Sequence, residues 1–86
     1  MGFFMTVSLP RDPRYAAMAR VIAVQSARDC GCENGPADAF AGGVENAART
    51  ILASDDANPH VVMAVERTTD ALVVTIDSQV MQLALT

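Results

Sequence analysis

Two cysteines, Cys30 and Cys32, carry the most reactive side chains in this sequence, and a single residue separates them. A structural zinc site needs four ligands, and the lone histidine, His60, lies 28 residues beyond Cys32 with no second ligand pair near it. A disulfide that spans one residue is strained, so the spacing predicts free thiols near a helix end. Free thiols are typical of the reducing cytoplasm. We therefore expect no metal site here.

The other candidates for acid–base chemistry are separated along the chain. His60 follows Pro59 at the start of a predicted strand, which favours a turn residue over a general base. Glu45 and Arg49 are four residues apart, in the order that stabilises a helix through an exposed ion pair. The sequence contains neither the spacing of a Ser-His-Asp triad nor a G-x-x-x-x-G-K phosphate loop. These patterns favour a protein that is not an enzyme.

The composition indicates a small acidic domain. The chain has 86 residues, of which 51% are hydrophobic, so we expect residues 1–86 to form a single domain around one core. Ten acidic residues outnumber six arginines, lysine is absent, and the net charge is −4. Binding to nucleic-acid phosphates or to an anionic membrane needs a basic face, so we expect neither partner. The absence of a secretory signal pattern and of a run of ~20 apolar residues favours a cytoplasmic protein.

The first elements follow from hydrophobic periodicity. Apolar residues alternate with polar ones over 5–9, which predicts a strand. Asp12 followed by Pro13 is a helix-start signal, and the apolar spacing that follows predicts a helix over 13–29 that ends at Gly31. The predicted apolar face of this helix comprises Tyr15, Met18, Val21, Ile22 and Val24.

A second helix is predicted over 36–53. Pro36 occupies its first position, and Asp38 lies in the first turn, where the helix dipole favours an acid. Gly42 and Gly43 lie inside this helix, and each costs roughly 1 kcal/mol relative to alanine. Two explanations for the pair are close packing or a kink, and a ligand that approaches the backbone. The predicted apolar stripe comprises Phe40, Val44, Ala47, Ala48 and Ile51.

Two alternating runs, 61–65 and 72–76, follow the turn-forming segment 54–59 and predict an antiparallel hairpin. The tail over 79–86 is too short to assign and is either a strand or a helix. The resulting order is β-α-α-β-β. It predicts an α+β two-layer sandwich with two helices packed on one face of a small, mainly antiparallel sheet.

This order of elements, together with the segment SLPRDPRY that leads into a long helix, resembles the N-terminal part of the bacterial anti-sigma-factor kinases. Those proteins belong to the GHKL (histidine-kinase-like) ATPase superfamily. The resemblance covers residues 5–78 and leaves 79–86 as a C-terminal tail. In that family the second helix carries an acid, a Glu and an Asn in a D-x6-E-x3-N arrangement, and the following hairpin ends in Asp-x-Gly.

The resemblance implies two possible alignments of the second helix. Placing Glu45 on the family's Glu, which polarises the attacking water or hydroxyl, also places Asp38 on the preceding acid. That alignment puts Arg49 where the Mg²⁺-binding Asn belongs. Placing Asn46 on that Asn instead puts Gly42 where the Glu belongs. We prefer the first alignment because it keeps both acids, but each alignment lacks one essential group.

Asp77 matches the Asp that accepts the adenine amine in this family, but the residues that follow it, Ser78 to Met81, include no glycine. All five glycines of the chain lie at or before position 43, so a glycine-flanked adenine loop cannot be built. The resemblance therefore implies a degenerate member that uses no cofactor. Any surviving nucleotide site would comprise Glu45, Asn46, Arg49 and Asp77.

We therefore expect a non-catalytic regulatory module that binds another protein, as anti-sigma factors bind sigma factors or antagonist proteins. The alternative is a nucleotide-binding protein or serine kinase of the GHKL class with an incomplete site. The predicted hairpin is apolar on both faces and two helices cover only one of them, so we also expect a homodimer. The predicted interface comprises Val62, Val73, Val80, Met81, Leu83 and Leu85.

Overall fold

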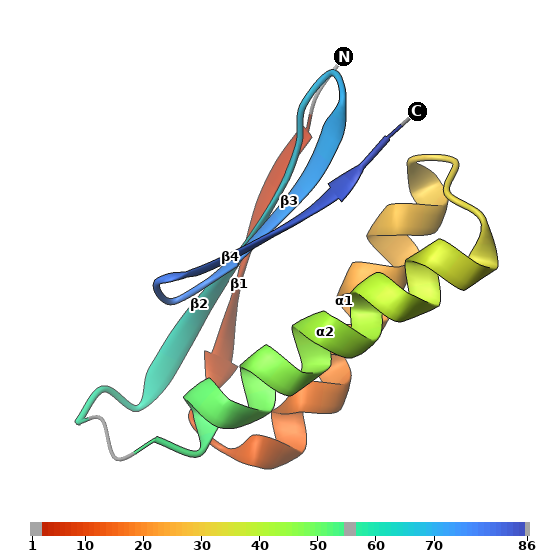
Figure 1. Ribbon diagram of the computed structural model, residues 1–86. Helices are drawn as coiled ribbons and strands as arrows, with labels where there is room; N and C mark the ends of the chain where they lie inside the picture. The colour runs from red at the N-terminus through yellow and green to blue at the C-terminus, as the bar shows by residue number, and fades with distance from the viewer. Residues whose placement is uncertain (1–2, 55–56, 86) are drawn as a thin grey trace.

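The chain folds into two layers, with a pair of helices packed on one face of a four-stranded sheet (Figure 1). The computed structural model describes residues 3–54 and 57–85, and at residue 3 it describes the backbone alone. Residues 55–56 of the predicted turn and residue 86 of the predicted tail lie outside the described residues. The predicted α+β class is confirmed. The elements are β1 (Phe3–Pro10), the 3₁₀ turn η1 (Pro13–Tyr15), α1 (Ala16–Asp29), α2 (Asn34–Leu52), β2 (His60–Arg67), β3 (Ala71–Ile76) and β4 (Gln79–Ala84).

The sheet is an antiparallel meander in the order β1-β2-β3-β4. β1 pairs directly with β2, although both helices lie between these strands in the sequence, and the pairing sets Leu9 opposite Val61. The segment that the sequence left open as strand or helix forms β4, which pairs with β3. The sheet therefore has one more strand than predicted, and β1 and β4 are its two edges.

α1 begins and ends at signals that are visible in the sequence. The Asp12 carboxylate accepts a hydrogen bond from the backbone N–H of Arg14 at 3.0 Å, and Pro13 opens the 3₁₀ turn that leads into α1. The Arg14 guanidinium also donates to Asp12, with Nη2 2.7 Å from Oδ2, and these hydrogen bonds lower the pKa of the Asp12 carboxyl. Gly31 ends the helix with φ +89°, a left-handed conformation that glycine adopts without steric cost. The helix predicted over 13–29 is thus confirmed, with its first turn wound as a 3₁₀ helix.

The helix faces that enter the core are lined largely by alanine, and the predicted apolar stripes are wrong in part. Met18 and Val21 were predicted to be core residues of α1 but are 50% and 62% exposed. In α2, Phe40 and Ile51 are only half-buried. Small side chains let two helices approach closely, so the larger residues lie beside the contact and not in it. The buried residues are Ala16, Ala19, Ala23, Ser26 and Ala27 of α1, and Ala37, Ala41, Val44, Ala48 and Leu52 of α2.

Gly42 and Gly43 do not mark a close contact between elements. A Cβ atom at Gly42 would meet the tip of the Arg20 side chain, with Nη1 3.8 Å away, and a Cβ atom at Gly43 would meet no atom within 4 Å. α2 continues as one helix through both residues. Close packing, which was part of the first explanation for the pair, is therefore wrong.

The two faces of the sheet have different surroundings. One face packs against the helices, and no described element covers the other (Figure 1). Neither helix in the described part of the chain is long and apolar enough to cross a membrane. The residues buried on the helix-facing side are Leu9, Val61, Met63, Val65, Leu72, Val74 and Ile76.

Candidate functional site

Three of the four residues predicted for a nucleotide site lie together on α2. Arg49 contacts both of its predicted neighbours, with Nη2 3.2 Å from Glu45 Oε2 and Nη1 3.4 Å from Asn46 Oδ1. The structure adds a partner that sequence reasoning missed, because Arg20 on α1 places Nη1 3.2 Å from Glu45 Oε1. Each oxygen of the Glu45 carboxylate therefore accepts a hydrogen bond from an arginine.

This pairing determines what Glu45 can do chemically. A general base needs a carboxylate oxygen that faces the water or hydroxyl from which it takes a proton. Here the Glu45 side chain is only 20% exposed, and its two oxygens face the guanidinium groups of Arg20 and Arg49. The predicted helix-stabilising pair between Glu45 and Arg49 is confirmed, and the group as a whole ties α1 to α2.

Asp77 lies apart from this cluster, in the turn between β3 and β4. Its φ is +56°, a left-handed conformation that aspartate tolerates better than most residues, and its backbone N–H donates to the Val62 carbonyl at 3.3 Å. Its exposed side chain makes no hydrogen bond or ion pair with Glu45, Asn46 or Arg49. The geometry therefore supports a strand-end turn at Asp77, and the predicted four-residue set does not converge.

The six residues predicted for a dimer interface do not share one surface. The pairing of Val74 with Met81 and of Leu72 with Leu83 places these β4 residues on the helix-facing side of the sheet. Met81, Leu83 and Leu85 are half-buried there and pack against the core. The predicted set is therefore wrong as a single face, because β4 alternates between the two sides of the sheet.

The other three predicted residues lie on the outer face of the sheet, the face turned away from the helices (Figure 1). A fourth apolar residue that the sequence analysis missed lies there too. Val62 is 56% exposed and Val80 is 58% exposed, and the half-buried Val73 lies on β3 opposite Glu66 and Gln82. Phe4, which sequence reasoning left outside the first strand, is 65% exposed. Extending the alternation of β1 backward by one residue would have found it. Polar residues, among them Thr6, Glu66 and Gln82, separate the apolar side chains.

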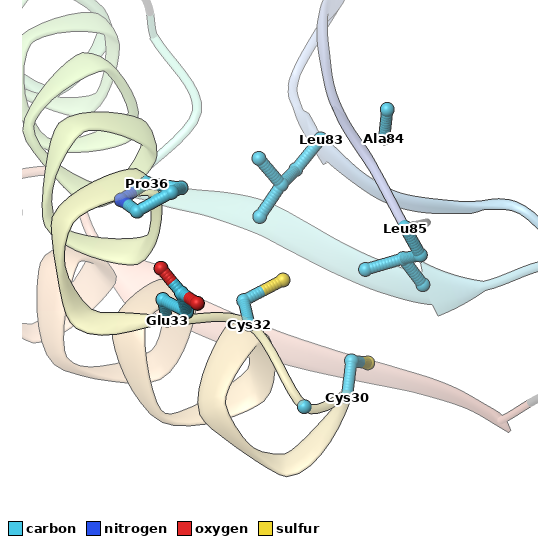
Figure 2. Close-up of a pocket in the computed structure, with 8 residues that line it drawn as sticks. Cys30, Cys32, Glu33, Pro36, Leu83, Ala84 and Leu85 are labelled. Atoms are coloured by element: carbon cyan, nitrogen blue, oxygen red, sulfur yellow. The ribbon is translucent and has the colours of Figure 1, made fainter.

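A cavity of about 430 Å³ lies at the end of the helix pair where α1 turns into α2, between this turn and the end of β4. Figure 2 shows Cys30 and Cys32 on one side of it and Leu83 and Leu85 on the other. Both cysteines are free, as predicted. Burial raises the pKa of the Cys30 thiol, and the charge of Arg67 partly opposes that rise. Sequence reasoning missed this cavity because it left the strand that forms one wall unassigned.

Comparison with known proteins adds no relative to this description. No family model, no curated protein and no solved structure matches the chain. The resemblance to the anti-sigma-factor kinases therefore remains a hypothesis drawn from residues 5–78.

Proposed function

We propose that this chain is a non-catalytic regulatory module that acts by binding another protein through the outer face of its sheet. The observation that carries this proposal is the exposure of Phe4, Val62 and Val80 on a face that no described element covers. These side chains are spread over β1, β2 and β4 on one uncovered face of the sheet, and such a face offers exposed apolar surface to a protein partner.

The mixture of residues on this face fits a partner that binds reversibly. Phe4 lies in register with Glu66, and the pairing of β2 with β3 sets Glu66 opposite Val73. Val80 lies opposite Thr75 on β3. An interface that alternates apolar and polar groups resembles those of proteins that are stable both alone and in complex.

The state of Glu45 supports a binding role over phosphoryl transfer. Both of its oxygens accept hydrogen bonds from arginines, and Arg49 occupies the position where the resembled family has a magnesium ligand. The residues that the resemblance assigns to adenine and to the phosphates are not joined to each other. By the same resemblance, the partner class is a sigma factor or an antagonist protein in the cytoplasm.

We further propose that two copies of the chain associate through this outer face when no other partner is present. A two-fold dimer is the commonest way to cover such a surface, since the same patch serves both copies. The exposed edge strand β4 continues the face and extends the surface available for pairing.

Two valines of similar exposure provide a matched test. Val62 lies on the outer face and is 56% exposed, whereas Val21 lies on α1 and is 62% exposed. Sedimentation equilibrium at micromolar concentration should show a dimer for the parent chain and for Val21→Lys, and a monomer for Val62→Lys. A parent chain that stays monomeric at every concentration would exclude self-association.

Affinity capture from a native lysate tests binding to a different protein with the same pair of variants. We expect Val21→Lys to retain the captured partner and Val62→Lys to lose it, because only the second change places a charge in the interface. Equal capture by both variants would show that the outer face is not the binding surface.

A further inference from the structure

The cavity at the α1–α2 turn contains the only two thiols of the sequence. Cys30 caps the end of α1, and Cys32 comes just before the first turn of α2. Figure 2 shows both sulfur atoms on the side of the turn that faces Leu85. The cavity therefore presents a pair of metal-binding atoms that the proposed function does not use.

Backbone hydrogen bonds hold the two cysteines in place. The N–H of Cys30 donates to the Ser26 carbonyl at 3.1 Å, and the N–H of Cys32 donates to the Ala27 carbonyl at 3.0 Å. Between them, Gly31 adopts a left-handed conformation that a residue with a side chain would adopt only with strain. The two thiols are thus carried by a helix cap, which is more rigid than a free loop.

The number of available ligands limits which ion this cavity could hold. Among the residues that the structure describes, no group of three or more His, Cys, Asp or Glu side chains is placed to bind a metal. Zinc takes three or four protein ligands, and magnesium and calcium prefer oxygen. A pair of thiolates suits a soft ion that accepts two sulfur ligands, and Cu(I) is the common biological ion of that kind.

Arg67, at the end of β2, supplies a positive charge next to this pair. The strand register sets Arg67 level with Leu72 and so with Leu83, which lines the cavity, and the Arg67 Nε is buried without a hydrogen-bond partner. A buried donor that lacks an acceptor is costly, so such a group favours a nearby anion. Cu(I) held by two thiolates forms a complex with a net charge of −1, which this guanidinium would balance.

We propose that the cavity binds one Cu(I) ion between the thiolates of Cys30 and Cys32. Each thiol releases its proton to solvent as its sulfur bonds to the ion, and copper stays in the +1 state, so the step needs no oxidant or reductant. Leu83 and Leu85 form the opposite wall and offer no side-chain ligand that would compete with the two sulfurs.

A competition titration tests this site on the whole chain. The reduced protein, kept under argon, is titrated with Cu(I) in the presence of the coloured Cu(I) chelator bathocuproine disulfonate. We expect one ion per chain, a near-ultraviolet band from thiolate-to-copper charge transfer, and two sulfur neighbours in the X-ray absorption spectrum. One ion shared between two chains, or nitrogen from His60 in the copper shell, would overturn the proposal.

Four variants identify the ligands. Loss of a group that only hydrogen-bonds to a metal ligand lowers metal affinity by up to roughly 100-fold. Cys30→Ser and Cys32→Ser each remove a ligand itself, so each should lower Cu(I) affinity by more than that. Arg67→Met, which keeps the apolar stem, should lower it roughly 10-fold. The matched control is Met18→Leu, which removes an exposed sulfur from α1 and should change nothing.

Circular dichroism verifies that each variant keeps the parent fold before its affinity is compared. Serine variants that are folded and bind Cu(I) as tightly as the parent chain would show that the thiols are not the ligands. Release of copper with formation of a disulfide between the two cysteines would also contradict the proposal.

Discussion

The ion pair between Asp12 and Arg14 lies at the start of the first helical turn, and it makes the stability of the chain depend on pH. The Asp12 carboxylate accepts hydrogen bonds from the side chain and from the backbone of Arg14, and these bonds lower its pKa below the ordinary value of 3.8. A carboxyl with a lower pKa in the folded chain stabilises that state above the unfolded pKa. This contribution is lost as the pH falls through the lowered value.

We therefore expect the difference in melting temperature between the parent chain and Asp12→Asn to depend on pH. The parent should be more stable near neutral pH, and the difference should shrink as the pH falls below 3.8, because the parent carboxyl is then protonated. Thermal unfolding followed by circular dichroism across this range measures it. In an Arg14→Met background the same comparison should show a smaller dependence on pH, because only the backbone N–H of residue 14 still donates to Asp12, and a gap that persisted in acid would contradict the assignment.

At the scale of the elements, the strands and their pairing were largely predictable. The alternation over 61–65 and 72–76 is strong because each strand has one buried face, and a strand repeats every two residues. The start of the first helix was equally clear, since Asp12 and Pro13 combine a side-chain cap with a fixed backbone angle. β4 was not assigned because its alternation is weak, and it depends on pairing with β3 for its conformation.

The buried faces of the helices were less predictable, for a physical reason. A search for apolar periodicity gives most weight to large side chains such as Met18, Val21 and Phe40. The contact between α1 and α2 instead uses alanines, which are apolar but too common and too small to define a stripe. Which alanines are buried depends on how closely the two helices approach, and that distance is a property of the folded molecule.

Gly43 permits a direct test at this scale. Because no atom lies within 4 Å of the position where a Cβ would stand, Gly43→Ala should raise the free energy of unfolding by roughly 0.4–1 kcal/mol. Gly31→Ala, the control, should lower it, since alanine is strained at a φ of +89°. Urea unfolding measures both. A loss of stability in Gly43→Ala would mean that the glycine serves a purpose other than packing.

At the scale of the whole molecule, the predicted nucleotide site does not assemble. The spacing along α2 correctly placed Glu45, Asn46 and Arg49 on neighbouring turns of one helix. Local spacing says nothing, however, about the distance between a helix and a turn at the edge of the sheet, where Asp77 lies. Sequence reasoning also had no signal for Arg20, because the contact of Arg20 with Glu45 joins two different helices.

We accordingly expect the purified chain to bind ATP with Mg²⁺ no more tightly than the millimolar range. A ligand that binds the folded state must raise the melting temperature, so thermal unfolding with and without millimolar ATP and Mg²⁺ is a direct measurement, and calorimetry is its complement. No rise is expected for the parent chain or for Glu45→Gln. A clear rise that disappears in Glu45→Gln would favour a GHKL-type nucleotide site.

The pairing of β1 with β2 also affects how the chain reaches its fold during synthesis. Leu9 pairs with Val61, 52 positions further along, so the first strand leaves the ribosome well before its neighbour exists. At translation rates of about 5–20 residues per second, this delay lasts on the order of 3–10 s. The helical hairpin and the β2–β4 meander are local and can form quickly, whereas β1 can join the edge of the sheet only after β2 has been made. We infer that docking of β1 is the last step of folding, and that a chain halted before Val61 leaves Leu9 without its neighbour.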